Sequence, residues 1–204
     1  MKPLFAMLAL AGVAAGADVS GHYVLRGGQE VGSEMLLKPD GTFEYMLAYG
    51  AADYSAKGSW KLDGDAVVLN SLGQKAPPFR LVRSTASKTG GLCVSVKAPN
   101  GQPVPNIQAI AMAPQGKAEQ MTDAQGTACF PDGVKATGVM LEVRVYGVEA
   151  GPFAVAPNRN AYEFEINGDA IMNVPFQNER LKLNAGGLEL RYWDREKAMQ
   201  YQKQ

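Results

Sequence analysis

Residues 33–47 read SEMLLKPDGTFEYML and contain the pattern that decides the fold. Apolar residues recur at alternate positions on both sides of Pro39-Asp40-Gly41, as in two antiparallel strands joined by a tight turn. A three-residue turn with Gly41 in the left-handed conformation pairs Lys38 with Thr42. It places one apolar set on a single face: Met35, Leu37, Phe43, Tyr45 and Leu47. Because a slip of one residue would exchange the two faces, we predict this register over a two-residue turn.

A second hairpin follows in GSWKLDGDAVVL, residues 58–69. A two-residue turn at Asp63-Gly64 pairs Leu62 with Asp65 and groups Trp60, Leu62, Val67 and Leu69. Each hairpin then has one apolar face, as expected for strands that wrap a barrel or half-barrel. Residues 78–84, PFRLVRS, are a third strand candidate for the same sheet.

The chain beyond residues 87–91 (SKTGG), a predicted linker, has a different composition. Strands are predicted around Leu92–Lys97 and Ile107–Ala113, and further ones in TACF, GVMLEVRVYG, FAVAP and NAYEFEIN. About six short strands in some 80 residues are typical of a small sandwich.

The earlier pattern returns after Val174, with strands on both sides of Ala185-Gly186-Gly187 and a last one at Met199–Lys203. Three strands are too few for a stable domain. We therefore expect them to complete the sheet begun by residues 20–86, with the sandwich inserted. The predicted parts are residues 18–88, the sandwich at 89–168, and returning strands at 169–204. Two sequential domains with a C-terminal extension are the alternative.

Residues 1–17 have the three parts of a secretory signal: a charged Lys2, an apolar run, and the small residues Ala15-Gly16-Ala17. We expect cleavage after Ala17 and a periplasmic or secreted protein. An uncleaved membrane anchor is the alternative. No cysteine lies near the cut, so a lipoprotein anchor is not expected.

The charges of the chain are balanced and interspersed, with 20 basic and 20 acidic side chains. Nucleic-acid and membrane-surface binders usually have a concentrated basic field, so neither partner is expected. Cys93 and Cys129 are the two cysteines. In an exported protein such a pair usually forms a structural disulfide, with two free buried thiols as the alternative.

The stretch VSVKAPNGQPVPNIQAIAM…TDAQGTACF, within residues 91–167, resembles the carboxypeptidase-regulatory-like and transthyretin-like sandwich modules. The resemblance implies a fold rather than a function. In TDAQG, Asp123 can accept a backbone hydrogen bond and Gly126 can adopt positive φ, so a tight turn is expected. Alternation then places Cys93 and Cys129 on outer faces, which allows a bridge between neighbouring strands of one sheet.

The flanking phrases GHYVLRG, KPDGTFEY and GSWKLDGDAVVL resemble the sheets of lipocalin-type, calycin-like barrels. The predicted fold is therefore an all-β, lipocalin-like antiparallel barrel or half-barrel interrupted by an inserted transthyretin-like sandwich. The resemblance implies binding of a small apolar ligand or of another protein.

Motifs for catalysis and metal binding are missing from the sequence. His22 is the single histidine, no Gly-x-Ser-x-Gly serine elbow occurs, and no cluster of His or Cys has ligand spacing. No cofactor or metal is expected. The transthyretin-like hydrolases use several histidines and a C-terminal Tyr-Arg-Gly-Ser motif, which this chain lacks. A pair of carboxylates suited to glycoside hydrolysis cannot be recognised by spacing alone.

Aromatic residues identify a candidate binding surface. Tyr192 and Trp193 lie in RYWDREKAMQY, for which we favour a strand pair with Trp193 packed inward over a binding surface. Tyr49 and Tyr54 lie in AYGAADYSAKG. Trp60 completes the set. We expect an exported, non-enzymatic binding protein for a small apolar ligand or an envelope protein, inhibitor and immunity types included. A hydrolase with a carboxylate pair is the alternative.

Overall fold

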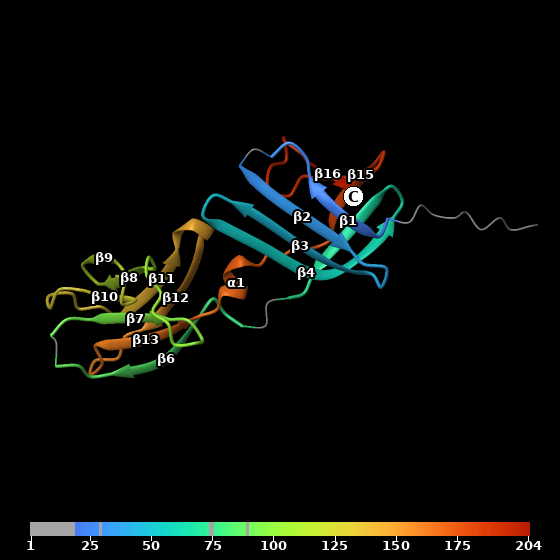
Figure 1. The fold of residues 1–204 in the computed structure, drawn as a ribbon. Coiled ribbons are helices and arrows are strands. Elements are labelled where there is room, and N and C mark those ends of the chain that lie inside the picture. Colours follow the sequence, from blue (N-terminus) through green and yellow to red (C-terminus); the bar gives the residue numbers. More distant parts are fainter. Residues whose placement is uncertain (1–18, 29, 74–75, 89) are drawn as a thin grey trace, which may run out of the picture.

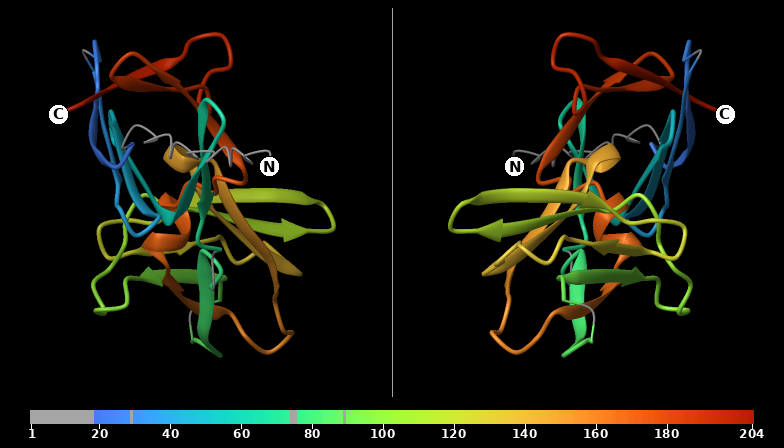
Figure 2. Two further views of the ribbon diagram at one scale, coloured as in Figure 1. Left: turned by 90° about the vertical axis from the view of Figure 1, so that its right-hand side faces the viewer. Right: turned by 90° about the vertical axis from the view of Figure 1, so that its left-hand side faces the viewer.

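A computed structural model describes residues 19–28, 30–73, 76–88 and 90–204, and the predicted signal segment at 1–17 lies outside them. The all-β prediction is confirmed: eight antiparallel strands form a closed barrel, and two four-stranded sheets form a second body beside it (Figures 1 and 2). No family identity follows from that architecture.

The barrel has the strand order β1-β16-β15-β14-β5-β4-β3-β2. Its strands are β1 (Gly21–Leu25), β2 (Val31–Leu37), β3 (Thr42–Tyr49), β4 (Ala52–Asp63), β5 (Ala66–Ser71), β14 (Glu179–Asn184), β15 (Gly187–Leu190) and β16 (Met199–Lys203). β1 pairs with both β2 and β16, which closes the ring. The C-terminal strands therefore complete a sheet that the N-terminal strands begin.

The second body contains sheets of order β10-β7-β13-β6 and β12-β11-β8-β9. Its strands are β6 (Phe79–Thr85), β7 (Cys93–Lys97), β8 (Gln108–Ala113), β9 (Gly116–Met121), β10 (Thr127–Cys129), β11 (Gly138–Val143), β12 (Val148–Ala154) and β13 (Ala161–Ile166). A short 3₁₀ helix η1 (Arg144–Tyr146) follows β11, and α1 (Gly168–Met172) precedes the return to the barrel. Residues from both sheets form one apolar core that is separate from the core of the barrel.

The first hairpin has the predicted register. The Lys38 backbone N–H donates to the Thr42 carbonyl at 2.8 Å, and Gly41 has a φ of 80°. All five residues of the predicted inner set are at most 5% exposed. The alternation in residues 33–47 therefore predicted this part of the barrel wall correctly.

The second hairpin differs from its predicted register. Leu62 lies opposite Val67 rather than Asp65, so the two turn residues are Gly64 and Asp65. The shift places Gly64, at a φ of 63°, in the first central position of the turn, which requires positive φ and would be strained for Asp63. Trp60, Leu62, Val67 and Leu69 still share one face, but Leu62 at the turn is 44% exposed.

The third strand candidate belongs to the other body. β6 pairs with β13, with Phe79 opposite Ile166, and Phe79 is buried in the sandwich core. The expectation that residues 78–84 extend the barrel sheet is wrong, because β14 pairs along the edge of β5 where a further strand would lie. Of the predicted linker at 87–91, the described residues connect β6 to β7 within the sandwich.

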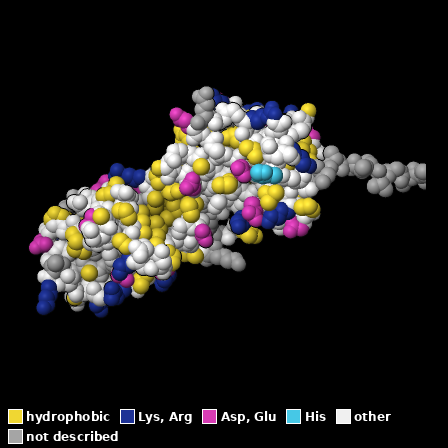
Figure 3. Space-filling model, viewed as in Figure 1, with side chains coloured by type: hydrophobic (Ala, Val, Ile, Leu, Met, Phe, Trp, Pro, Cys, Tyr) yellow, Lys and Arg dark blue, Asp and Glu magenta, His cyan; other side chains and the backbone are white. Residues whose placement is uncertain are grey.

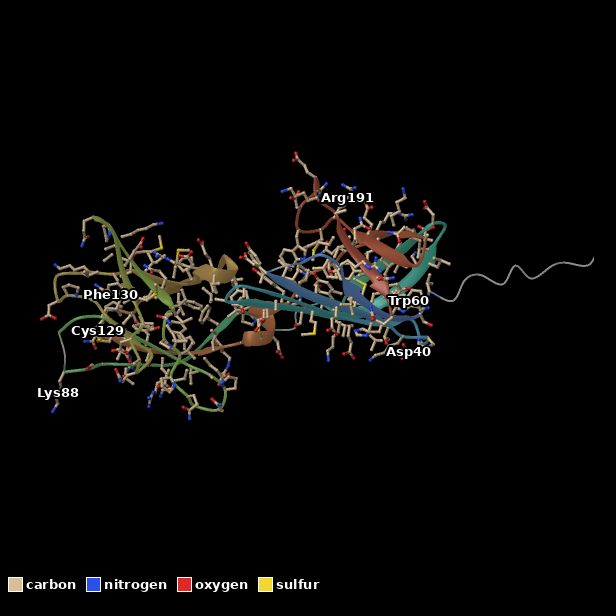
Figure 4. All side chains as sticks on the ribbon, turned by 45° about the horizontal axis from the view of Figure 1, so that its top comes forward. Asp40, Trp60, Lys88, Cys129, Phe130 and Arg191 are labelled. Carbon is tan, nitrogen blue, oxygen red and sulfur yellow. A yellow bond between two sulfur atoms is a disulfide. The ribbon has the colours of Figure 1, made fainter. Side chains whose placement is uncertain are left out.

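The stretch TDAQGTACF forms the predicted turn and strand. An Asp123 carboxylate oxygen accepts from the backbone N–H groups of Gln125 and Thr127, both at 2.9 Å, and Gly126 has a φ of 70°. Cys129 lies directly opposite Cys93 across β10 and β7, with sulfur atoms at the disulfide distance of 2.10 Å (Figure 4). This agrees with a predicted bridge between neighbouring strands of one sheet.

The interior of the barrel is filled with side chains. Phe176, from the segment between α1 and β14, is 1% exposed, and its ring centroid lies 5.2 Å from that of Tyr45 and 6.1 Å from that of Phe43. The segment that returns from the sandwich thus supplies a central core residue of the barrel.

Candidate functional site

The two ends of the barrel have different connections. Tight turns join β2 to β3, β4 to β5 and β14 to β15 at one end, which we call the turn end. The opposite, loop end has the β1–β2 connection, the β3–β4 turn and the long loop 191–198. The chain also leaves the barrel after Ser71 and re-enters it at Glu179 at this end. The loop end is therefore where the longest connections and the sandwich meet the barrel.

An open hollow of about 750 Å³ lies at the loop end. Its lining is predominantly apolar: Leu25, Gly27, Gly28, Val31, Leu47, Tyr49, Tyr54, Trp193, Ala198 and Met199, with Arg26, Asp194, Lys197 and Gln200 as the polar residues. We call this the loop-end hollow. It combines three aromatic rings with a few polar groups, the composition typical of small-molecule sites.

Trp193 is fixed by contacts on three sides. Its indole Nε1–H donates to the Tyr45 hydroxyl oxygen at 2.8 Å, and its ring centroid lies 4.6 Å from that of Tyr54 and 5.3 Å from that of Tyr192. The side chain nevertheless remains 39% exposed. The favoured expectation of a strand pair with Trp193 packed inward is wrong, because residues 191–198 form a loop and β16 begins at Met199.

Behind Trp193 lies a buried cluster of hydroxyl groups that the sequence analysis missed. Ser33, Tyr45 and Tyr201 are each at most 3% exposed. The Ser33 hydroxyl donates to the Met46 carbonyl at 2.7 Å and lies 2.7 Å from the Tyr201 hydroxyl. Burial raises the pKa of both Tyr45 and Tyr201, so both phenols stay protonated at neutral pH. The signal for Ser33 was its inward position in the alternation with Met35 and Leu37.

A second hollow of about 620 Å³ adjoins the first where barrel and sandwich meet. Tyr49 and Tyr54 line both, and Val145 of η1 lines the second. The Tyr54 and Tyr146 rings are in edge contact at 5.4 Å, and the Asp53 backbone N–H donates to the Tyr146 hydroxyl at 3.2 Å. Figure 3 shows hydrophobic side chains gathered at this junction. We call this the junction hollow.

The structure brings together four of the five predicted surface residues. Tyr49, Tyr54 and Trp193 line the loop-end hollow, and Tyr192 lies beside Trp193 with its ring 4.9 Å from Phe176. Trp60 is separate: its indole N–H donates to the Lys38 carbonyl at 2.9 Å at the turn end. Figure 4 shows it near Asp40 and away from Arg191.

Glu34 and Glu44 line one outer-face hollow with His22, and each has a hydrogen-bond partner. His22 Nε2 lies 2.9 Å from Glu34, and Lys38 donates to Glu44 at 2.6 Å. The hydrogen bond from Lys38 lowers the pKa of Glu44. In residues 19–28, 30–73, 76–88 and 90–204, no group of three or more His, Cys, Asp or Glu could hold a metal ion.

No helix within the described part of the chain is long and apolar enough to cross a membrane. Comparison of the chain with protein-family models, curated proteins and solved structures finds no significant match. The lipocalin-like and transthyretin-like resemblances therefore remain sequence-based expectations.

Proposed function

We propose that this protein is an exported, non-enzymatic binding protein that holds a small, largely apolar molecule in the loop-end hollow. The observation that carries the proposal is the convergence of Tyr49, Tyr54 and Trp193 on one open hollow of about 750 Å³. That volume lies within the roughly 300–1,000 Å³ typical of small-molecule sites.

The ligand would bind at the mouth of the barrel and not in its interior. Phe176, Phe43 and Tyr45 occupy the interior and are at most 3% exposed. At the mouth, the hydrogen bond to Tyr45 and the ring contacts with Tyr54 and Tyr192 hold the Trp193 indole in place. A preorganised aromatic surface loses little conformational freedom when a ligand covers it, which favours affinity.

The pKa shifts and positions of Glu44 and Glu179 support a non-enzymatic role over a glycosidase. A glycosidase needs one carboxylic acid with a raised pKa and a second carboxylate about 5–10 Å away. Glu44, on the outer face, has a lowered pKa because Lys38 donates to it. Glu179 has a raised pKa through burial, but it does not line the loop-end hollow.

The proposed location is the periplasm or the exterior of the cell. The bonded pair Cys93 and Cys129 supports an oxidising compartment, where such bridges persist. The signal segment that would direct export lies within residues 1–17, outside the described residues.

Native mass spectrometry of the protein purified from its own compartment tests the proposal. We expect an added mass that is lost on gentle activation, that is absent from Trp193→Ala, and that persists in Trp60→Ala. A wild-type protein that carries no added mass and takes up no apolar probe would contradict it.

Docking of an envelope protein at the junction hollow is the second candidate. It is favoured by the exposure of Tyr49 and Val145, at 57% and 51%. Large exposed apolar side chains at a concave junction are typical of interaction sites. Val145→Asp should then abolish association with that partner and leave small-molecule binding at the loop end unchanged.

A further inference from the structure

Two cations border the loop-end hollow. Arg26 and Lys197 both line it, one directly after β1 and the other in the 191–198 loop. Within the described part of the chain, neither side chain makes an ion pair, in contrast to the arginines of the sandwich outer face and of the turn end. Two positive charges thus line the same hollow as the aromatic side chains, and the charge of Lys197 also acts on Asp194 in that lining.

The one carboxylate in that lining is already bonded to the loop backbone. An Asp194 oxygen accepts from the Glu196 N–H at 2.7 Å and from the Lys197 N–H at 3.1 Å. These bonds lower the pKa of Asp194 and hold its charge against the loop. Glu30, which lies between the lining residues Gly28 and Val31 in the chain, lines the junction hollow and not the loop-end hollow. The lining of the loop-end hollow therefore has an excess of one positive charge.

The cation at Arg26 has a fixed backbone position relative to the apolar lining. The Arg26 N–H donates to the Gln200 carbonyl at 2.8 Å, which extends the β1–β16 pairing by one residue. Leu25, its neighbour, packs against the barrel core and lines the same hollow. Leu25 and Arg26 are therefore consecutive residues, one apolar and one cationic, that both line the hollow.

We propose that the ligand of the loop-end hollow is an amphipathic molecule, with an apolar body against Tyr49, Tyr54 and Trp193 and an anionic head group between Arg26 and Lys197. The inference rests on the proposed function and adds the sign of the ligand's charge. Hydrogen bonds between a cation and an anion are stronger than those between neutral groups, and because Arg26 and Lys197 are both exposed, salt should screen their attraction for the head group.

Three probes with one chain length and different head groups test the inference: octanoate, octan-1-ol and octylammonium. The chain has two tryptophans, so a Trp60→Phe background leaves Trp193 as the sole indole reporter in the hollow. We expect octanoate to bind about tenfold more tightly than octan-1-ol, and octylammonium to bind weakest. Added salt should narrow the gap between octanoate and octan-1-ol.

Two double variants, each of which removes two positive charges, show whether Arg26 and Lys197 cause the preference for octanoate. Arg26→Gln with Lys197→Gln should weaken octanoate binding about tenfold and octan-1-ol binding by less than about twofold. Retained binding of octan-1-ol also shows that the hollow is intact. Lys61→Gln with Lys88→Gln removes two exposed cations elsewhere, one on β4 and one at the far tip of the sandwich (Figure 4), and should change neither.

The outcomes separate this inference from the proposed function. Equal affinity for octanoate and octan-1-ol, or tighter binding of octylammonium, would overturn the anionic head group and leave the binding role standing. Failure of all three probes to bind would overturn both.

Discussion

The two ends of the barrel are built from the same eight strands, yet they place similar residues in different environments. Trp60 at the turn end donates to the Lys38 carbonyl of a neighbouring hairpin. Trp193 at the loop end donates to Tyr45, which is 148 positions away in the chain. One indole stabilises a local turn, whereas the other joins a loop to the buried hydroxyl cluster and faces an open hollow. The comparison teaches that the hydrogen-bond partner of a tryptophan, which residue type does not reveal, decides whether the side chain supports a local turn or ties a distant loop to the barrel core.

Removing Phe176 should have the largest effect, because this side chain fills the barrel behind the loop end. Phe176→Ala is expected to lower the free energy of unfolding by about 3–5 kcal/mol, through lost apolar burial and the cavity left behind. Urea unfolding measures it. Because Tyr192 loses its ring partner, binding of octan-1-ol should also weaken.

The matched control for Phe176 is Phe164→Ala in the sandwich core, where the side chain is equally buried. It should cost a similar amount of stability and leave binding unchanged in buffer where the variant stays folded. A loss below about 1 kcal/mol for Phe176→Ala would show that the barrel is not packed around this ring.

Replacing each tryptophan in turn by alanine tests the comparison between the two ends directly. Trp193→Ala removes two ring contacts and the hydrogen bond to Tyr45, and should weaken octan-1-ol binding at least about tenfold by calorimetry. Trp60→Ala should leave the affinity unchanged, although it loses the bond to the Lys38 carbonyl. Equal losses from both variants would mean that the two ends do not differ in function.

The hydroxyl cluster behind the loop end should make the barrel sensitive to alkali. Burial raises the pKa of Tyr45 and Tyr201, so the folded chain retains protons that the unfolded chain loses above about pH 10. The stability that these phenols contribute is complete below that pH and is lost as the pH rises further.

Tyr201→Phe tests this by urea unfolding across neutral and alkaline pH. It should cost about 1 kcal/mol at neutral pH, from the lost contact with the Ser33 hydroxyl, and should make the alkaline decline shallower. If the free energy of unfolding of Tyr201→Phe declines with rising pH as steeply as that of the wild type, the sensitivity to alkali comes from other groups.

The smallest expected effect concerns Glu179, at the point where β14 begins at the loop end. Burial raises its pKa, and the charge of Arg195 opposes that shift. Folding therefore disfavours the ionised form, and stability falls as the pH rises through the ordinary carboxyl range. Glu179→Gln should stabilise the protein by less than about 1 kcal/mol at neutral pH, and the gain should disappear at about pH 4.

Glu44→Gln is the control with opposite sign, because the hydrogen bond from Lys38 lowers the pKa of Glu44. Its replacement should not stabilise the protein at neutral pH. Thermal unfolding at several pH values distinguishes the two variants. A destabilised Glu179→Gln at neutral pH would mean that the attraction of the Arg195 charge outweighs the cost of burial.

Much of the fold could be predicted where the determinants are local. The alternation in residues 33–47 and the turn residues at Gly41 and Gly126 fixed faces and registers that the structure has. The same reasoning misplaced the Gly64 turn by one residue and assigned β6 to the wrong body. Alternation identifies a strand and its apolar face, but it does not say which sheet that face will cover.

The candidate site was predictable in its aromatic residues and not in its arrangement. Tyr49, Tyr54, Tyr192 and Trp193 were identified by residue type, as was Trp60, which lies at the opposite end. Ser33 and Tyr201 were missed because a polar residue on an inward face becomes meaningful only when its partner is known.

The sequence by itself determined the β class, the inward faces of the strands and the positions of several turns, because these depend on side-chain alternation and on residues that tolerate positive φ. Only the tertiary structure decided that β1 meets β16, that Phe176 fills the barrel, and that Arg26 and Lys197 border one hollow. Those contacts join residues far apart in the chain, and closing such loops leaves no local signal in the sequence.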